Sequence, residues 1–356
     1  YNYNTFSKIN DINNTAYIDV LCSYLFSQLV IDKKLPSFAI YYGSVNGLGD
    51  YRCDITEEYD DLRVDKCFSQ NLGKTYEIDM YMSNSESDDS DSEIDDSVSE
   101  SGNSYSETSS DYNSSSCADD YIAKIKNIPI QLLFIEKLEG TLEDYLYDEN
   151  FQNDVLISCL FQISFSLHYL QTYYSFTHND LHINNVMFKK TESKYLYYKY
   201  NNIYFRVPTY GYVFKIIDFG RAIFKYRDKV YMNDVFSDYG EAGGQYTYPK
   251  QVQFTIKRDR EYIKPNYHFD LCRLSMTILE ELNDKEYSEE SLKFLNHMCK
   301  NSCDISFCDM PDDFYLYKSI AKDACNCLPR EIIMNDIFKS YRIKKKLFPR
   351  KSYYTL

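Results

Sequence analysis

Apolar residues recur along this chain with two periods, and these periods predict where its helices and strands lie. Residues 15–31 carry apolar side chains at spacings of three and four, which is one face of a helix that Thr15 could cap. Residues 153–174 repeat this spacing with a stripe of Leu and Ile. Residues 36–42 predict a strand, and the continuous apolar run at 130–138 predicts a buried strand.

Other stretches break this periodicity. Residues 83–120 are almost entirely Ser, Asp, Glu, Asn and Thr, so they cannot bury enough apolar surface to offset the entropy of ordering. We expect a disordered acidic insertion there. Gly43, Gly47 and Gly49 follow the order G-x-x-x-G-x-G, which predicts a surface turn and not a phosphate-binding loop.

Two short motifs combine with strand-like runs in the second half of the chain. The first is His178-x-Asp180-Leu181-x-x-x-Asn185, followed by the run V-M-F. The second is the D-F-G sequence that begins at Asp218, preceded by V-F-K-I-I. A hairpin of the two runs would present carboxylate and amide oxygens together, and such hard ligands suit Mg²⁺.

The Tyr-rich residues 191–212 lie between these motifs and predict an additional hairpin. Its turn is expected at Asn201 and Asn202, because Asn favours tight turns between strands. The aromatic side chains could stack on nucleic-acid bases, but packing on a strand face is the expectation we prefer.

The order and spacing of the two motifs resemble the eukaryotic-type protein kinase superfamily. Residues 207–222 read V-P-T-Y-G-Y-V-F-K-I-I-D-F-G-R-A, and the chain is rich in Tyr and Asn. In both respects it resembles the mimivirus-like serine/threonine protein kinases of giant DNA viruses. The resemblance implies an α+β, protein-kinase-like two-lobed fold with an abbreviated N-lobe sheet and a mainly helical C-lobe. It implies a partial N-lobe over 1–138, a C-lobe over 139–345 and a basic tail over 346–356.

The resemblance also implies roles in phosphoryl transfer. Asp180 would be the catalytic carboxylate that accepts or orients the proton of the substrate hydroxyl, and Asn185 and Asp218 would be the metal ligands. His182 stands where the superfamily has a lysine that touches the transferring phosphate. Asn179 replaces an arginine that usually pairs with a phosphorylated activation segment, so activation by that route is not expected.

The nucleotide would be held by residues of the first lobe. Ile135 would guard the back of the pocket, and the backbones of Glu136 and Leu138 would bond the adenine edge. Asp19 would be the acidic partner of an ATP-orienting lysine, with an ordinary solvent-facing Asp as the alternative. Lys8 is the candidate for that lysine, unless the lysine and a glycine-rich loop lie upstream or are lacking.

Two further residues have structural roles by the same resemblance. Asp270 lies in an apolar helical pattern and matches a buried aspartate that ties down the catalytic loop; a charge there must be satisfied. His178 is expected to hold the loop by hydrogen bonds. Gly220 is expected to allow the backbone to turn after Asp218.

Composition limits the classes of partner. The net charge is −15, and the segment 81–120 holds twelve Asp or Glu and no Lys or Arg, so the acidity belongs mostly to that segment. This argues against a nucleic-acid binder or a membrane-surface binder. No uninterrupted apolar run reaches the roughly 18 residues that a membrane span needs. We expect a monomer in the cytoplasm (host cytoplasm or virion if the protein is viral).

The eleven Cys residues are an odd number, and several fall inside apolar helical patterns, which indicates reduced thiols and not a disulfide framework. Five of them are loosely clustered, and a zinc site is the alternative to ordinary thiols there: Cys299, Cys303, Cys308, Cys325 and Cys327.

The resemblance therefore implies Mg²⁺-dependent transfer of the ATP γ-phosphoryl group to Ser or Thr hydroxyls of a protein substrate. Two alternatives stay open. The motif H-x-D-L-H-x-x-N also occurs in small-molecule kinases of the aminoglycoside and choline type. A pseudokinase that acts as a scaffold is the other alternative, because no glycine-rich phosphate loop is visible.

Overall fold

The computed structural model describes residues 3–81, 120–249, 262–282, 287–311 and 314–356, and this part of the chain is mixed α and β. It divides into two compact units, unit 1 (Tyr1–Val45 and Leu133–Leu356) and unit 2 (Asn46–Leu132). The lobe boundary predicted at residue 138 lies inside unit 1 and stays a prediction. The segment predicted to be disordered lies outside the described residues except for Asp120, which begins a strand.

Unit 1 contains most of the helices. They are α1 Tyr3–Ile9, α2 Thr15–Ile31, α5 Leu142–Tyr147, α6 Asn153–Tyr174, α8 Phe269–Glu281, α9 Glu289–Met298, α10 Phe314–Asp323 and α11 Pro329–Ile332, with 3-10 turns at Ile183–Asn185, Asp234–Phe236, Phe307–Asp309, Asp336–Tyr341 and Lys345–Leu347. The helices predicted at 15–31 and 153–174 are confirmed with these bounds. The cap of α2 is Asn14 and not Thr15, because the Asn14 side chain accepts a 2.8 Å hydrogen bond from the Ala16 N–H.

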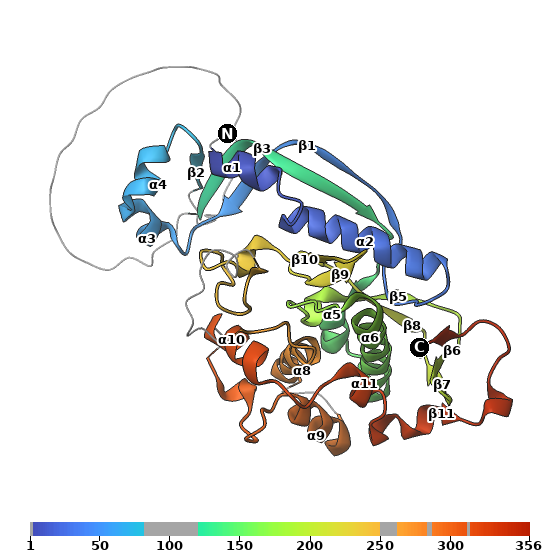
Figure 1. The fold of residues 1–356 in the computed structure, drawn as a ribbon. Coiled ribbons are helices and arrows are strands. Elements are labelled where there is room, and N and C mark those ends of the chain that lie inside the picture. Colours follow the sequence, from blue (N-terminus) through green and yellow to red (C-terminus); the bar gives the residue numbers. More distant parts are fainter. Residues whose placement is uncertain (1–2, 82–119, 250–261, 283–286, 312–313) are drawn as a thin grey trace, which may run out of the picture. The chain divides into compact units, whose positions relative to one another are not determined.

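Helix α6 is the core of unit 1. Its residues from Val155 to Gln171 are all buried, and α11 packs on it (Figure 1). By length and composition α6 could cross a membrane, which differs from our expectation of no such run, but 94% of its apolar window is buried inside the fold. This burial is typical of the central helix of a packed core. Helix α6 ends directly before the loop that carries Asp180.

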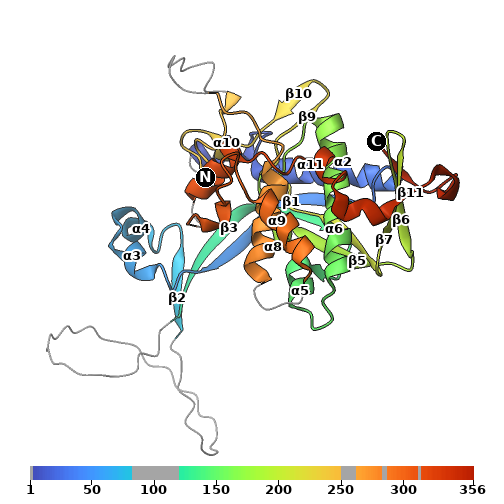
Figure 2. The ribbon, with the colours of Figure 1, turned by 90° about the horizontal axis from the view of Figure 1, so that it is seen from below.

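The strands of unit 1 form small sheets. One sheet has the order β4-β5-β8 (Gly140–Thr141, Val186–Lys190 and Tyr212–Ile216), and another has the order β11-β7-β6-β12 (Arg342–Ile343, Ile203–Pro208, Tyr195–Tyr200 and Tyr354–Thr355). A short pair joins β9 Phe224–Tyr226 and β10 Lys229–Tyr231. The hairpin predicted within 191–212 is confirmed as β6 and β7, with Asn201 and Asn202 between them. Figures 1 and 2 both place it on the side of α6 away from α8.

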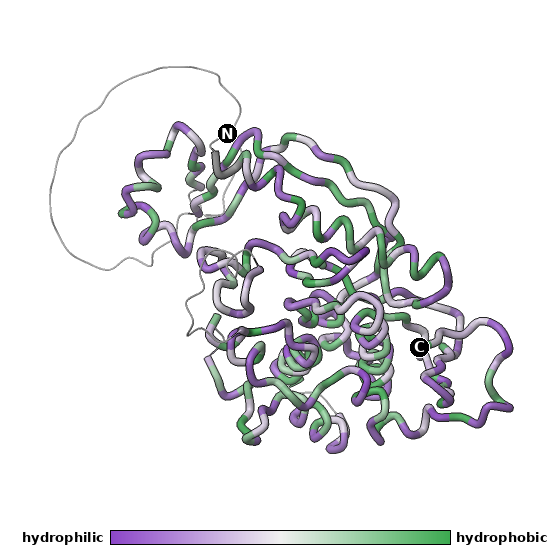
Figure 3. Tube along the Cα trace, in the orientation of Figure 1, coloured by the Kyte–Doolittle hydropathy of each residue, from purple (hydrophilic) through white to green (hydrophobic). Residues whose placement is uncertain are grey.

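Unit 2 is built on the strand order β1-β3-β2, in which β2 (Glu77–Tyr81) pairs antiparallel with β3 (Asp120–Ile135). Its short helices α3 (Tyr59–Val64) and α4 (Lys66–Asn71) bury none of their residues, and Figure 3 shows many hydrophilic positions along them. The surface turn predicted at Gly43, Gly47 and Gly49 is wrong, because all three lie within strand β1 (Tyr41–Asp54).

Gly49 lies close to the neighbouring strand β3. A Cβ atom at Gly49 would lie 2.8 Å from the Ile130 Cδ1 atom, so a larger residue there would displace the Ile130 side chain. A Cβ atom at Gly43 or Gly47 would meet nothing within 4 Å.

An aromatic cluster fixes α2 in unit 1. The Phe26 ring lies 5.1 Å from the Phe38 ring, 5.4 Å from the Phe176 ring and 5.1 Å from the Phe219 ring, measured between centroids. Phe26, Phe38 and Phe176 are fully or almost fully buried. The contacts of Phe26 with Phe176 and Phe219 are edge-to-face, which stabilises the packing beyond the buried area alone. Helix α2 is thereby held beside the D-F-G sequence.

Candidate active site

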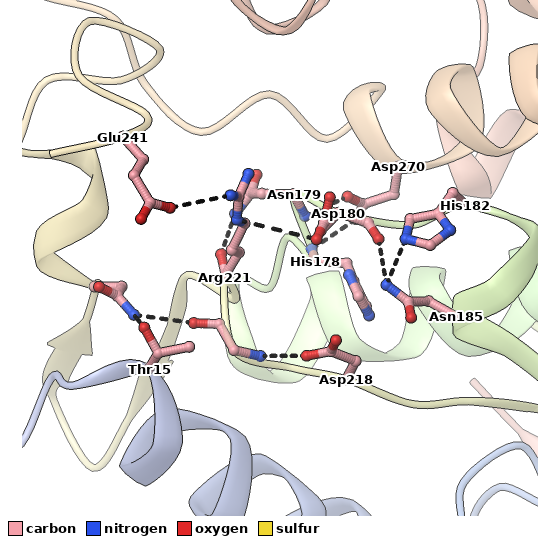
Figure 4. Close-up of polar contacts among 12 residues, drawn as sticks. Thr15, His178, Asn179, Asp180, His182, Asn185, Asp218, Arg221, Glu241 and Asp270 are labelled. Atoms are coloured by element: carbon pink, nitrogen blue, oxygen red, sulfur yellow. Dashed lines mark hydrogen bonds and ion pairs between the residues drawn. The ribbon is translucent and has the colours of Figure 1, made fainter. Parts of the chain in front are cut away.

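The two sequence motifs meet because strands β5 and β8 pair antiparallel. Val186 is opposite Ile216, and the ladder continues past the strand end through a 3.1 Å hydrogen bond from the Ile217 N–H to the Asn185 carbonyl. Asn185 and Asp218 are therefore brought to adjacent positions at one end of the hairpin. The Asn185 side-chain amide also donates to the Asp180 carbonyl at 2.8 Å (Figure 4). The hairpin predicted from the flanking runs is confirmed.

Asp270 ties the loop that carries Asp180 to helix α8. The carboxylate of Asp270 is fully buried and accepts hydrogen bonds of 2.9 Å from the backbone N–H groups of both His178 and Asn179. Burial raises the pKa of Asp270, and these hydrogen bonds partly oppose the rise. The His178 ring contacts the Ile217 carbonyl at 2.9 Å, so His178 holds the loop against the strand before Asp218. This geometry agrees with the structural roles expected for Asp270 and His178.

Asp218 is exposed and adopts a left-handed backbone conformation, with φ of 59°. Asp and Asn adopt this conformation more readily than other non-glycine residues, and the Asp218 Oδ1 atom accepts a 3.3 Å hydrogen bond from the Gly220 N–H. Gly220 is needed for a different reason from the expected turn. It has no left-handed φ, but a Cβ atom there would lie 2.7 Å from the Thr15 Cγ2 atom of α2.

Asp19 reaches this loop from α2. Its Oδ1 accepts a 2.9 Å hydrogen bond from the Phe219 N–H. Burial raises the pKa of Asp19, and the hydrogen bond from Phe219 opposes that rise. Asp19 is thus not the freely solvated side chain of the alternative interpretation.

Lys8 does not fit its predicted position. It lies on helix α1 and not on a strand, its side chain is exposed, and no ion pair joins these two described residues, Lys8 and Asp19. The nearest structural role for Lys8 is local, since its carbonyl accepts from the Asn14 side chain at 3.0 Å. Within the described residues, the structure brings Asp19 to the site and leaves Lys8 outside it.

A cavity of about 200 Å³ lies beside Asp218 in unit 1. Ile135 lines it, which agrees with the expectation that this residue stands at the back of a pocket. The lining is mostly apolar and contains two carboxylates: Asp19, Ser23, Phe38, Ala39, Leu133, Ile135, Ile216, Ile217, Asp218 and Phe219.

The segment after β3 leaves backbone groups available beside this cavity. The Glu136 N–H donates to the Ile40 carbonyl at 2.7 Å, but within the described part of the chain no hydrogen bond uses the Glu136 carbonyl or the Leu138 N–H and carbonyl. A planar base with donor and acceptor edges could bond such groups. The backbone-mediated role predicted for Glu136 and Leu138 is compatible with this arrangement and stays a prediction.

The side chain of Glu136 has a role that the sequence reasoning missed. It forms a buried ion pair with Lys215 at 2.9 Å, a second ion pair with Lys189, and accepts from the Ile40 N–H at 3.2 Å. Burial opposes ionisation of Glu136, but the two lysines hold its pKa below the usual value. Lysine within the apolar run V-F-K-I-I was the signal in the sequence, because a charge inside a buried strand needs a partner.

His182 is half-buried and contacts its own loop. Its Nδ1 accepts from the Asn184 N–H at 3.3 Å, and its Nε2 lies 3.1 Å from the Asn185 amide nitrogen. A neutral imidazole has one acceptor nitrogen, so with Nδ1 accepting its proton is on Nε2. Burial lowers the pKa of His182. The contact of His182 with a transferring phosphate stays a prediction.

The donor set at the end of the hairpin fits Mg²⁺ bound together with a phosphate. The Asn185 amide nitrogen is already engaged, which leaves its Oδ1 as a neutral oxygen at the end of the hairpin that also carries Asp218 (Figure 4). Mg²⁺ usually takes only one or two carboxylates from a protein and completes its shell with water and phosphate. No group of three or more His, Cys, Asp or Glu that could hold a metal by itself occurs among the described residues.

The five clustered cysteines are all free thiols in the structure, which gives the zinc alternative no support among them. Cys299 is buried, and Cys308 is exposed and in hydrogen-bond contact with it. This contact lowers the pKa of Cys308 to about 7 and helps to raise the pKa of Cys299.

We expect Cys308 to react with iodoacetamide faster than the other cysteines that the structure describes. At pH 7 about half of it would be thiolate, against a few per cent of an ordinary thiol, so its rate should exceed that of exposed Cys303 about fivefold or more. Mass-spectrometric mapping between pH 6 and 9 measures this. The Cys299→Ala variant should move the inflection of Cys308 upward, and equal rates at Cys303 and Cys308 would contradict the prediction.

Comparisons with known proteins agree with a kinase-like relationship. A protein of Dictyostelium discoideum named a probable serine/threonine-protein kinase is 37% identical over 113 residues, which are 29% of this chain and 9% of that protein. A second relative, from Acanthamoeba polyphaga mimivirus, is also named as a serine/threonine-protein kinase. It is 25% identical over 201 residues, which are 52% of this chain and 47% of that protein. The matches span less than half the length of either relative, and no protein-family profile matches the chain.

Proposed function

We propose that this chain is a protein kinase that transfers the γ-phosphoryl group of ATP to Ser or Thr hydroxyls of a protein substrate. One observation supports the proposal: hydrogen bonds of the hairpin and of the loop bring three polar residues together, namely Asp180, Asn185 and Asp218. The proposed fold is the two-lobed protein-kinase-like arrangement. The names of the two relatives support the same class of reaction.

Each residue has a defined task in this proposal. The Asp180 carboxylate orients the acceptor hydroxyl and takes its proton, while the hydroxyl oxygen forms the new bond to phosphorus and ADP leaves with the electrons of the broken bond. Asp218 and Asn185 hold Mg²⁺, which when bound neutralises negative charge on the phosphates. The backbone of Glu136 and Leu138 binds the adenine edge, with Ile135 behind it.

The fixed positions of these groups are the main catalytic contribution we infer. A loose phosphoryl-transfer transition state needs alignment and charge stabilisation more than strong deprotonation. The buried hydrogen bonds of Asp270 to the loop and of Asp19 to Phe219 supply that alignment before any ligand binds.

The test is transfer of label from ATP labelled in its γ-phosphate, with the full chain, Mg²⁺ and a mixture of Ser- and Thr-containing peptides. A parallel reaction offers small alcohols, including choline and an aminoglycoside. Label on the peptides supports the proposal, whereas label only on the small alcohols favours the small-molecule kinase. No transfer together with no change in melting temperature on adding ATP and Mg²⁺ would favour the scaffold.

The Asp218→Asn variant should lower kcat/KM for ATP by about 10²-fold or more, because several kilocalories per mole of charge stabilisation by the metal would be weakened. Its thermal shift with ATP should lose its dependence on Mg²⁺. Asp304→Asn is a matched control, because Asp304 is also left-handed (φ 62°) but 83% exposed and paired only with Lys300. Equal behaviour of the two variants would contradict the role of Asp218.

A further inference from the structure

Arg221 immediately follows the D-F-G sequence and lies beside the carboxylate of Asp180. Its Nε atom is 4.0 Å from Asp180 Oδ2, and its other end is 3.5 Å from the Glu241 carboxylate (Figure 4). Its side chain is 30% exposed, so it can reach a bound ligand without leaving the loop. It is the only cationic side chain paired with Asp180 among the ion pairs of the described residues.

The backbone of Arg221 is fixed on both sides. The buried Asn179 side chain donates to the Arg221 carbonyl at 2.9 Å and to the Thr177 carbonyl at 3.3 Å. Before Arg221, the Gly220 carbonyl accepts from the Asn233 side chain at 3.1 Å. Asn179 thus has a task in this structure: it joins the loop of Asp180 to the start of the segment that carries Arg221.

A transferring phosphoryl group needs positive charge or hydrogen-bond donors beside its oxygens. Asp180, Asn185 and Asp218 supply carboxylates and an amide to the proposed site, but no cationic side chain. The guanidinium of Arg221 is charged at every physiological pH and has five donors in a planar fork that suits phosphate oxygens.

We propose that Arg221 is a catalytic residue that donates hydrogen bonds to the transferring phosphoryl group. This inference rests on the proposed function. In the transfer, the acceptor oxygen bonds to the γ-phosphorus, the bond from that phosphorus to the β–γ bridging oxygen breaks, and the hydroxyl proton passes to Asp180. Arg221 stabilises charge on the γ-phosphoryl oxygens throughout and is itself unchanged.

Glu241 is the partner that the phosphoryl group would replace. Its side chain is 80% exposed and its contact with Arg221 is 3.5 Å, so the pair is a weak surface ion pair and its exchange for a doubly charged phosphate is favourable. Glu241 is not part of the proposed site once the phosphoryl group has replaced it. Its removal should therefore leave turnover nearly unchanged.

The test compares Arg221→Gln, Arg221→Lys and Glu241→Gln in the full chain, with kcat and KM for ATP measured on the peptide found to accept phosphate. Arg221→Gln should lower kcat by about 10²-fold or more and change KM little, because the contact strengthens in the transition state. Arg221→Lys should recover part of kcat, and Glu241→Gln should stay within about threefold of the unaltered chain. Arg63→Gln, at an exposed ion pair with Asp60, controls for loss of positive charge.

A second measurement separates catalysis from folding. ADP with aluminium fluoride imitates the transferring group, and Arg221→Gln should weaken its binding while leaving ADP binding and the melting temperature unchanged. If the unaltered chain transfers phosphate and Arg221→Gln keeps its kcat and its affinity for the fluoride complex, the inference is overturned and the proposed function stands. If the unaltered chain transfers no phosphate to any acceptor, the proposed function fails and the inference with it.

Discussion

The Asp180→Asn variant should transfer phosphate about 10²–10⁴-fold more slowly than the unaltered chain, which is the usual contribution of a positioned acid or base. The amide keeps the size of the carboxylate but cannot accept the hydroxyl proton. The effect should fall on kcat, since Asp180 meets the acceptor hydroxyl and not the nucleotide. Steady-state kinetics with the peptide substrate measure both constants.

Folding should be unaffected by this substitution. The Asp180 side chain is half-buried, and its nearest cation, the Arg221 Nε atom, is 4.0 Å away. The melting temperature should therefore match that of the Asp304→Asn control. A kcat for Asp180→Asn within about tenfold of the unaltered chain would exclude Asp180 as the proton acceptor.

The Asp270→Ala variant should lower the free energy of unfolding by about 2–5 kcal/mol, because it leaves two buried backbone N–H groups without acceptors. Those groups belong to His178 and Asn179, so the loop of Asp180 should lose its fixed position as well. We expect kcat to fall even at temperatures where the variant is folded. Urea unfolding followed by circular dichroism measures the loss of stability.

Two further variants sharpen this result. Asp270→Asn keeps the shape but turns one acceptor into an amide donor facing an N–H group, so it should restore only part of the stability. Asp336→Ala removes an exposed carboxylate from the first turn of another helix and should change stability by no more than about 0.5 kcal/mol. If Asp270→Ala unfolds at the same urea concentration as Asp336→Ala, the hydrogen bonds to the loop contribute little.

Local periodicity was sufficient to predict the helices that carry the site, but not the burial of β3. Helices α2 and α6 have the predicted bounds, although α6 is buried on all sides and not on one face. The run at 130–138 predicted a buried strand, whereas β3 ends at Ile135 and exposes Leu132 and Phe134. The β5–β8 pair was predictable because its apolar runs flank the two motifs directly. Asp270 could be assigned because the resemblance to protein kinases implies a buried aspartate there, and a charge in an apolar helix must be satisfied.

Long-range pairing was not predictable in the same way. Glu136 and Lys215 are 79 positions apart, and no local pattern tells which carboxylate joins a buried lysine. Strand β1 passes through Gly43, Gly47 and Gly49 because it belongs to a sheet with β3, which overrides the weak strand preference of glycine. The role of Lys8 was not predictable either, because the resemblance required a strand at that position and the structure has helix α1 there.

The ladder between β5 and β8 also determines how the site tolerates changes in chain length. Cross-strand hydrogen bonds, and not the chain between them, set the relative position of Asn185 and Asp218. Residues could therefore be added at the turn between β6 and β7 without altering the spacing of the two oxygen ligands. A one-residue shift in the register of β8 would instead turn every side chain of that strand to the opposite face of the sheet and remove Asp218 from Asn185.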